Sequence, residues 1–173
     1  MSKAAQRIDT ARLVGTPLGE SDFDDLRLLH SDPRVTATLT ADGLPLSEQA
    51  TRDFLARTAD HWRRYAFGLM AFRDRASADF IGYSGIKHAI VEGADLIELA
   101  YAVRADRQRK GYATEMARSS IEVAFEQIHL EELVAFTLTH NQASRRVIES
   151  CGFRYDRDIT HAGLAHVLYR LRR

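Results

Sequence analysis

Three apolar runs of strand length follow one another in the middle of the chain, at residues 66–72, 80–88 and 96–103. They are rich in aromatic and branched side chains and are separated by short polar segments, a pattern typical of consecutive antiparallel strands. On both sides of this block the apolar residues recur at the spacing of a helical turn. The chain is therefore restricted to a sheet whose strands are combined with helices.

The flanking segments extend this pattern in both directions. Before the block we expect a strand at 10–14, helices at 21–30 and up to Leu39, and a helix opened by Ser47; after it we expect a helix at 113–128, a strand at 133–139, a helix at 142–151 and a hairpin of 153–159 with 164–171. This order predicts an α/β (α+β) fold, with a mixed, mostly antiparallel central sheet of about seven strands and helices on both faces. A length of 173 residues fits a single domain spanning residues 1–173.

The passage from the third apolar run into the next helix has the features of an anion site. The first turn of a helix leaves backbone N–H groups unpaired, and the helix dipole favours negative charge there. Gly111 lets a ligand approach the backbone, small Ala113 keeps that approach open, and the Thr114 hydroxyl can bond a phosphate oxygen. Local positive charge comes from Arg104, Arg107, Arg109 and Lys110. The alternative is that Gly111 only shapes the helix entry and the basic residues form a solvated rim.

The glycine pattern is neither a nucleoside-triphosphate loop nor a dinucleotide fingerprint, because Gly-x-x-x-x-Gly-Lys-Ser/Thr and Gly-x-Gly-x-x-Gly are both absent. It resembles the signature Gln/Arg-x-x-Gly-x-Gly/Ala of the GNAT acetyltransferase superfamily, matched by residues 108–113. Three further blocks occur in the order and spacing of its RimJ/RimL-like branch, which includes enzymes that acetylate ribosomal-protein N-termini: 98–101, 141–144 and 149–153. The resemblance covers nearly the whole chain and implies a GNAT-like fold.

The resemblance also implies acetyl-coenzyme A as acetyl donor. Its pantetheine arm would lie along the backbone of Tyr101 and Val103, and its pyrophosphate would bind at the start of the following helix. The residues implied there are Gln108, Arg109, Lys110, Gly111, Tyr112, Ala113 and Thr114, with Tyr112 expected to pack beside the coenzyme. The chain departs from the common pattern at Ala105, often proline, and at Arg109, often glycine.

Acetyl transfer to an amine needs a neutral amine, a polarised thioester carbonyl and a stabilised thiolate. Glu98 is a carboxylate within the apolar run 96–103, where burial would disfavour its charged form and suit it to the role of general base. The resemblance agrees, since acetyltransferases of this type often hold a glutamate at this position. The alternative is a Glu98 that faces the sheet edge and pairs with a surface arginine. The carbonyl would be polarised by a backbone amide near Val103.

Asn141 and Ser144 stand where a strand gives way to a helix. An asparagine there is an ordinary N-cap for the Ser144 amide. The resemblance implies instead that Asn141 contacts the pantetheine arm and that Ser144 protonates or hydrogen-bonds the leaving thiolate. Many superfamily members use a tyrosine seven positions after this asparagine, but here that position is Ile148.

The composition of the chain limits the kinds of partner that it can be expected to bind. Lys plus Arg equals Asp plus Glu, 24 each, so the chain lacks the broad positive field that would bind DNA, and RNA binding by the basic turn is the least favoured interpretation. No apolar run approaches a membrane span, and we expect a cytoplasmic protein without membrane contact. The only cysteine, Cys151, is expected to be a small buried residue. We expect no metal: His161 and His166 are expected to be surface or packing residues.

The sequence thus predicts an acetyl-coenzyme A-dependent N-acetyltransferase. The acceptor would be a primary amine, on a protein N-terminus or a small molecule, attacking directly in a ternary complex, since no nucleophilic triad is visible. The amine pocket is expected between the early helices, 21–65, and the final hairpin, with His140 as a candidate lining residue. The alternative function is a degenerate sensor or scaffold that binds coenzyme A without turnover. The acceptor's identity and the choice between monomer and homodimer stay open.

Overall fold

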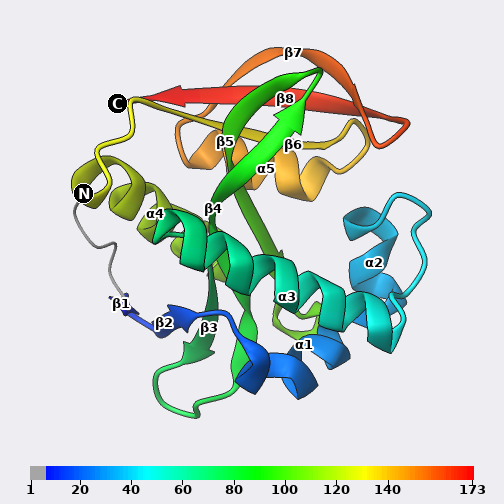
Figure 1. The fold of residues 1–173 in the computed structure, drawn as a ribbon, viewed down its shortest axis with the longest axis vertical. Helices are drawn as coiled ribbons and strands as arrows, with labels where there is room; N and C mark the ends of the chain where they lie inside the picture. Colours follow the sequence, from blue (N-terminus) through cyan, green and yellow to red (C-terminus); the bar gives the residue numbers. More distant parts are fainter. Residues whose placement is uncertain (1–6) are drawn as a thin grey trace.

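The computed structural model describes residues 7–173 and contains one sheet of eight strands with helices on both faces (Figure 1). The strands are β1 (Ile8–Asp9), β2 (Leu13–Pro17), β3 (Leu69–Asp74), β4 (Phe80–Val91), β5 (Ala94–Val103), β6 (Glu132–Leu138), β7 (Arg154–His161) and β8 (Leu164–Arg172). The α-helices are α1 (Phe23–His30), α2 (Pro33–Leu39), α3 (Glu48–Tyr65), α4 (Tyr112–Glu122) and α5 (Gln142–Ser150). The predicted fold class is confirmed, with one short strand more than expected.

The first strand was predicted wrongly. Residues 10–12 form a turn between β1 and β2, because the Thr10 hydroxyl accepts a hydrogen bond from the Leu13 amide at 2.9 Å. Local bonds of this kind compete with strand pairing. The paired strand therefore begins at Leu13 and runs to Pro17, beside β3.

The helix predicted at 113–128 is present but changes geometry. It is α-helical from Tyr112 to Glu122 and continues as a wider π-helical turn, Val123–Gln127. At the other end of the region, α5 ends as expected just before Gly152, whose φ of 93° is the left-handed value that favours glycine.

Two hairpins have two-residue turns in which both residues have positive φ. Glu92 and Gly93 join β4 to β5 with φ values of 49° and 84°, and Ala162 and Gly163 join β7 to β8 with 49° and 77°. Such turns match the right-handed twist of the strands and fix the register of the pairs beyond them. As a result Lys87 stands directly opposite Glu98.

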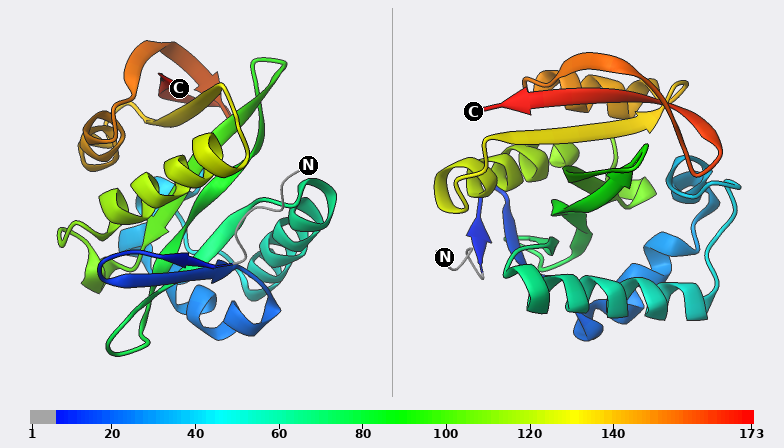
Figure 2. Two further views of the ribbon diagram at one scale, coloured as in Figure 1. Left: turned by 90° about the vertical axis from the view of Figure 1, so that its left-hand side faces the viewer. Right: turned by 45° about the horizontal axis from the view of Figure 1, so that its top comes forward.

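Side chains alternate between the two faces of the sheet. On one face Leu69 and Tyr83 pack in a core with Leu26 of α1 and Leu55 of α3. On the other face Met70 belongs to the core that includes residues of α4. Helices α1 to α3 therefore cover one face, and α4 with α5 covers the other (Figures 1 and 2).

The sheet divides between β5 and β6. Strand order is β1-β2-β3-β4-β5-β6-β8-β7, and β5 and β6 are its one parallel pair within residues 7–173. Their register holds a single pair, Glu98 with Val134, whereas β4 and β5 pair over their whole facing length. Beyond Glu98 the two strands separate, and Figure 2 shows β6, β7 and β8 as a group set apart from β4 and β5. This separation exposes one edge of residues 99–103.

Candidate active site

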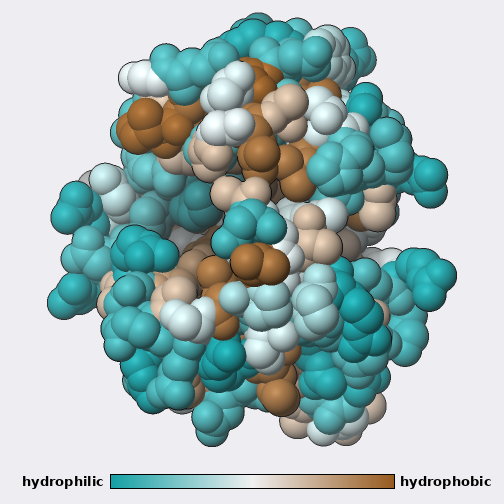
Figure 3. All heavy atoms as spheres, turned by 90° about the vertical axis from the view of Figure 1, so that its right-hand side faces the viewer, coloured by the Kyte–Doolittle hydropathy of each residue, from teal (hydrophilic) through white to brown (hydrophobic). Residues whose placement is uncertain are grey.

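A cleft of about 840 Å³ opens where β5 and β6 diverge. It is lined by β5, the start of α4, the start of α5, α2 and the tip of the β7–β8 hairpin. Figure 3 shows a face of the molecule on which apolar and polar side chains are mixed around a central hollow. Every residue predicted to act in catalysis or to bind the coenzyme lines this cleft except Lys110. Residues that are far apart in the sequence are therefore brought to one place.

Strand β5 presents its candidate residues to opposite faces of the sheet. Ala100 and Ala102 pack in the core shared with α1 and α3, and Glu98 has the same parity along the strand. Tyr101 packs against the core beneath α4 and α5. The cleft reaches both sets because the β6 side of the strand is open after Glu98. A molecule in the cleft can thus be contacted by Glu98 from one face and by Tyr101 and its neighbours from the other.

Glu98 is buried, with 8% of its surface exposed, and its carboxylate accepts a hydrogen bond from Lys87 Nζ at 2.5 Å. The pairing partner is thus a lysine on the adjacent strand inside the cleft, and not a surface arginine at the sheet edge. Tyr83 lies on the same face of β4, and burial, with the Glu98 charge as a second cause, raises its phenol pKa. Tyr83 therefore keeps its proton beside the carboxylate.

Tyr101 and Ser144 form the second polar group of the cleft. Their hydroxyl oxygens are 2.8 Å apart, and the Tyr101 hydroxyl also lies 3.2 Å from the Ser144 carbonyl oxygen. Burial raises the Tyr101 pKa to about 12, so the phenol is a hydrogen-bond donor at neutral pH. Tyr101 was expected to contribute through its backbone, and its side-chain bond to Ser144 was not predicted.

Asn141 is the N-cap of α5. Its Oδ1 accepts a hydrogen bond from the Ser144 amide at 3.1 Å, which fixes the first turn of the helix and the position of the Ser144 hydroxyl. The capping alternative is therefore realised. Asn141 also lines the cleft, and its amide nitrogen forms no hydrogen bond with residues 7–173. Capping by Oδ1 thus leaves Nδ2 free to donate to a ligand.

The turn before α4 forms a concave group of backbone amides. Arg109 and Gly111 both have left-handed φ, 59° and 79°, and Gly111 is the N-cap of α4. Amides arranged in this way, at a helix start, form an anion site. The left-handed conformation at 109 also explains why glycine is common there. Arg12 supports the turn from outside, donating to the Lys110 carbonyl at 2.9 Å and to Glu115 at 2.7 Å.

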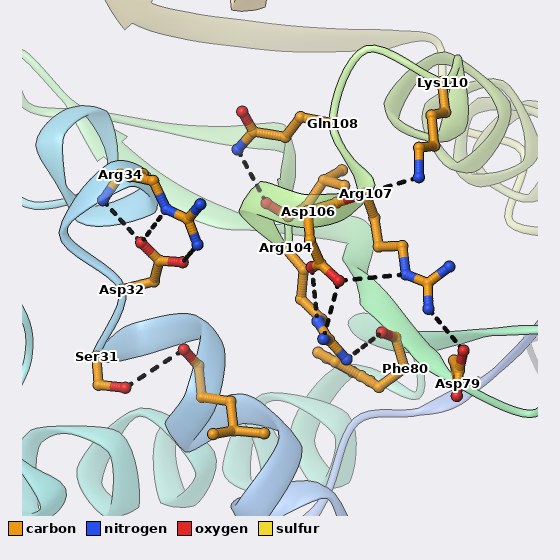
Figure 4. A network of polar contacts seen from close by, with 12 residues as sticks. Ser31, Asp32, Arg34, Asp79, Phe80, Arg104, Asp106, Arg107, Gln108 and Lys110 are labelled. Carbon is orange, nitrogen blue, oxygen red and sulfur yellow. Dashed lines mark hydrogen bonds and ion pairs between the residues drawn. The ribbon is translucent and has the colours of Figure 1, made fainter.

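Two of the four basic side chains around this turn are already ion-paired, which corrects the sequence interpretation. Arg104 pairs with Asp106 at 3.1 Å, and Arg107 pairs with Asp79 at 2.6 Å (Figure 4). Lys110 does not line the cleft, and its Nζ donates to the Asp106 carbonyl at 3.2 Å. Arg109 remains the one of these four that has no hydrogen bond or ion pair with residues 7–173. Backbone amides and Arg109 are thus the groups left for an anion.

Two further predicted residues act on the local structure. Gln108 donates from Nε2 to the Val103 carbonyl at 3.1 Å, which ties the turn back to the end of β5. Tyr112 is buried under the Arg12 guanidinium, 4.4 Å above its ring, and its hydroxyl donates to Asp74. Tyr112 thus packs at the start of α4, and its expected place beside the coenzyme stays a prediction.

Sequence reasoning missed the histidines of the cleft. His161 and His166 line it and form an aromatic group with Phe136, with ring centroids 4.7 Å and 5.9 Å from the Phe136 ring. Burial, followed by the His166 charge, lowers the His161 pKa, so this ring is neutral near pH 7. His140, which was expected to line the amine pocket, is exposed and lies outside the cleft. The hairpin that carries His161 and His166 was predicted, but its sequence does not show that the two rings line the cleft.

The cleft fits a coenzyme A thioester on its own geometry. The free edge of residues 99–103 can pair with an extended amide-containing arm, as an added strand does. At the end of that edge lies the amide group of the turn, with a glycine at its centre: a Cβ on Gly111 would meet Arg12 at 3.4 Å. The cleft can therefore accommodate the pantetheine arm and the pyrophosphate in the order in which they follow each other in coenzyme A.

Comparison with known proteins agrees with this geometry. The family model of the acetyltransferase (GNAT) domain matches residues 12–154. The chain belongs to the GNAT acetyltransferase family. It is an acetyl-coenzyme A-dependent N-acetyltransferase, and acetyl-coenzyme A is its acetyl donor.

Individual relatives extend the likeness over most of the chain. The Bacillus subtilis protein YkkB is 28% identical over 132 residues, 76% of this chain and 75% of YkkB. An acetyltransferase from Agrobacterium tumefaciens has the same fold, with a TM-score of 0.84 and 24% identity, covering 100% of this chain and 98% of that one. Mycobacterium smegmatis RimJ, solved with a coenzyme A disulfide, has a TM-score of 0.71 and 16% identity, covering 92% and 81%. The likeness to the RimJ/RimL-like branch thus includes the fold.

Two other features of residues 7–173 bear on partners. No helix there is long and apolar enough to cross a lipid bilayer. In the same part of the chain, no three side chains of the types that commonly bind metals are grouped so that they could hold an ion.

Proposed function

We propose that this GNAT member, as one domain over residues 1–173, transfers the acetyl group to a primary amine by direct attack in a ternary complex. The acceptor amine is carried by a protein N-terminus or by a small molecule. The single cysteine has a free thiol, which suits a reducing compartment such as the cytoplasm.

Glu98 is proposed as the general base. It is the one carboxylate among the described residues that line the cleft, and an acceptor enters that cleft as an ammonium ion. The ammonium proton passes to Glu98, directly or through water, and leaves a neutral amine that can attack. Lys87 holds the carboxylate in place from the opposite strand.

Ser144 is proposed to assist the departing thiolate. When the Tyr101 hydroxyl donates to Ser144 Oγ, the Ser144 proton is free to point into the cleft. It can then be donated to, or hydrogen-bonded by, the sulfur that leaves. A backbone amide near Val103 polarises the thioester carbonyl.

The observation that carries this proposal is the position of Glu98 and Ser144 on opposite sides of the open edge of β5. A carbonyl group in that opening has a base on the side from which the amine comes and a hydroxyl on the side to which the thiol leaves. The arm-binding residues Tyr101 and Val103 and the amides of 109–114, with Asn141, would align the thioester between them.

The test compares Glu98→Gln with Glu122→Gln, a control at an exposed position of α4. Thiol release from acetyl-coenzyme A is followed with a panel of amines and N-terminal peptides. Loss of a general base is expected to lower kcat at neutral pH by about 10²- to 10³-fold. The loss should shrink as pH rises, because the acceptor then deprotonates by itself. Equal rates for wild type and Glu98→Gln would remove Glu98 as the base. Coenzyme A binding without turnover of any amine would favour a sensor.

A further inference from the structure

The charges of the cleft bear on which amine can enter it. Five basic side chains line the cleft: Arg34, Lys87, Arg107, Arg109 and Arg146. Arg34 and Arg107 are ion-paired with Asp32 and Asp79, whereas Arg109 and Arg146 form no ion pair with residues 7–173. Glu98 is the one carboxylate among the lining residues that the structure describes, and it is already paired with Lys87. A polycation such as a polyamine would find a partner for one ammonium group and would leave the others facing cations. Such an acceptor is disfavoured, because buried charges need partners.

The Lys87–Glu98 pair itself is arranged as a template for the opposite kind of acceptor. The two residues are directly opposed on β4 and β5, with Nζ and Oε2 2.5 Å apart, so a positive and a negative group stand side by side in the wall. Lys87 has 34% of its side chain exposed and Glu98 has 10%. An amine that binds Glu98 as an ammonium ion competes with Lys87 for the one negative charge of the pair. Lys87 is then left in the cleft with an uncompensated charge.

That charge is matched if the acceptor brings its own carboxylate. In a zwitterion the ammonium group pairs with Glu98 while the neighbouring carboxylate pairs with Lys87, so every charge keeps a partner. A simple amine loses one ion pair for each one that it forms. We propose that the acceptor of this enzyme is a small zwitterionic amine of the α-amino acid type, whose carboxylate binds Lys87. This inference rests on the proposed function, because it assigns the acceptor of the same site.

The surroundings of the pair indicate the rest of the molecule. Phe136, His161 and His166 form one aromatic wall, and Tyr83 and Phe54, 5.5 Å apart between ring centroids, form another. These side chains favour an apolar or aromatic substituent on the zwitterion. We therefore expect amino acids with aromatic or branched aliphatic side chains.

The experiment uses pairs of acceptors that differ in the carboxylate alone. L-phenylalanine is compared with phenethylamine, and L-leucine with isoamylamine, with spermidine and a peptide with N-terminal phenylalanine as further arms. We measure kcat/KM by thiol release, and we measure binding of each amine to the coenzyme A complex by calorimetry. The amino acid is expected to exceed its decarboxylated partner by about 30-fold or more in kcat/KM for at least one pair. In the calorimetric titrations the amino acid should also bind at a lower concentration than its decarboxylated partner.

Lys87 variants test the cause of that preference. Lys87→Met should reduce the ratio between amino acid and amine to within about threefold, and Lys87→Arg should restore most of it. Arg63→Met, which removes a positive charge from an exposed position of α3, should leave the ratio unchanged. A purely structural role of Lys87 would lower the rates with both members of a pair and would preserve their ratio. That result would overturn the assignment.

Failure of this inference can be told from failure of the proposed function. If coenzyme A does not bind the purified protein, the acetyl-transfer site itself is wrong, and the acceptor assignment falls with it. If coenzyme A binds but the amines, spermidine or the peptide equal or exceed the amino acids, the zwitterion assignment is wrong and the acetyl-transfer site stands. The same conclusion follows if calorimetry detects no amino acid binding to the coenzyme A complex.

Discussion

The hydroxyl groups of Tyr101 and Ser144 are 2.8 Å apart although the residues are 43 positions apart in the sequence. One lies in the middle of the open part of β5, and the other lies in the first turn of α5. The bond therefore joins the two walls of the cleft at the point where β5 and β6 have separated. Position 148, where many superfamily members carry a tyrosine, is Ile148 here, and α5 contains no tyrosine. The phenol next to Ser144 is instead that of Tyr101, on the opposite wall of the cleft.

This relationship predicts different results for the two hydroxyls. Ser144→Ala removes the group proposed to face the thiolate, and we expect kcat to fall by about 10²-fold. Tyr101→Phe keeps the ring and removes only the bond that orients Ser144, so a fall of roughly tenfold is expected, the equivalent of one hydrogen bond. KM for acetyl-coenzyme A should change little in either variant. Ser150→Ala on the same helix, whose hydroxyl bonds Val147, is the control. A Tyr101→Phe enzyme slower than Ser144→Ala would make Tyr101 the primary donor.

Gly111 provides a test of the anion site that separates backbone strain from binding. Gly111→Ala places a side chain at φ 79° and 3.4 Å from Arg12. We expect a loss of about 1 kcal/mol in the free energy of unfolding and a rise of at least tenfold in Kd for coenzyme A. Gly93→Ala has the same backbone problem at φ 84°, in a hairpin turn with nothing within 4 Å of the new Cβ. It should lose similar stability and bind coenzyme A normally. Equal binding by both variants would argue against an anion at the α4 start.

Asn141 has a capping role in the structure and a proposed binding role, and the two can be separated. Asn141→Asp keeps an acceptor for the Ser144 amide, so stability should stay within about 0.5 kcal/mol, whereas Asn141→Ala should lose about 1 kcal/mol. Both remove the Nδ2 donor, and both should weaken coenzyme A binding by about tenfold. The comparison is Ser47→Ala, which removes the N-cap of α3 far along the chain from the cleft. Normal coenzyme A affinity of Asn141→Asp would show that Asn141 is a cap alone.

The strands and the anion turn could be predicted because their signals are local. Apolar spacing gave the order of the elements, and the glycine at 111 with its flanking residues gave the site on α4. The register of β4 and β5 was also within reach. With Glu92 and Gly93 as a two-residue turn, counting four residues back from Val91 and four forward from Ala94 pairs Lys87 with Glu98. The predicted strands, 80–88 and 96–103, both stopped short of this turn, so the pairing of Lys87 with Glu98 was not predicted.

Other features depend on contacts that no local pattern carries. The separation of β5 from β6 after a single pair is a relation between two strands that are distant from each other in the sequence. The pairing of Arg107 with Asp79 has the same origin, since it joins the turn to the start of β4. Charge counting along the chain therefore overstated the positive field at the turn. It could not distinguish Arg109, which forms no ion pair with residues 7–173, from arginines that are already paired.

His30 predicts how the stability of the fold changes with pH. Its ring is fully buried between α1 and α3, with Nδ1 3.2 Å from the Thr51 hydroxyl, and burial followed by the Arg27 charge lowers its pKa from 6.5 to about 4. Between pH 6.5 and about 4, the unfolded chain therefore binds a proton at His30 that the folded protein does not bind. The contribution of neutral His30 to the free energy of unfolding is fully present above pH 6.5. It is lost as pH falls from there towards 4, by up to about 3 kcal/mol. Urea unfolding at pH 7 and pH 5 measures this loss. His30→Gln, which cannot titrate, should be less stable at pH 7 but should lose less on acidification. An equal loss in both proteins would assign the acid sensitivity to other groups.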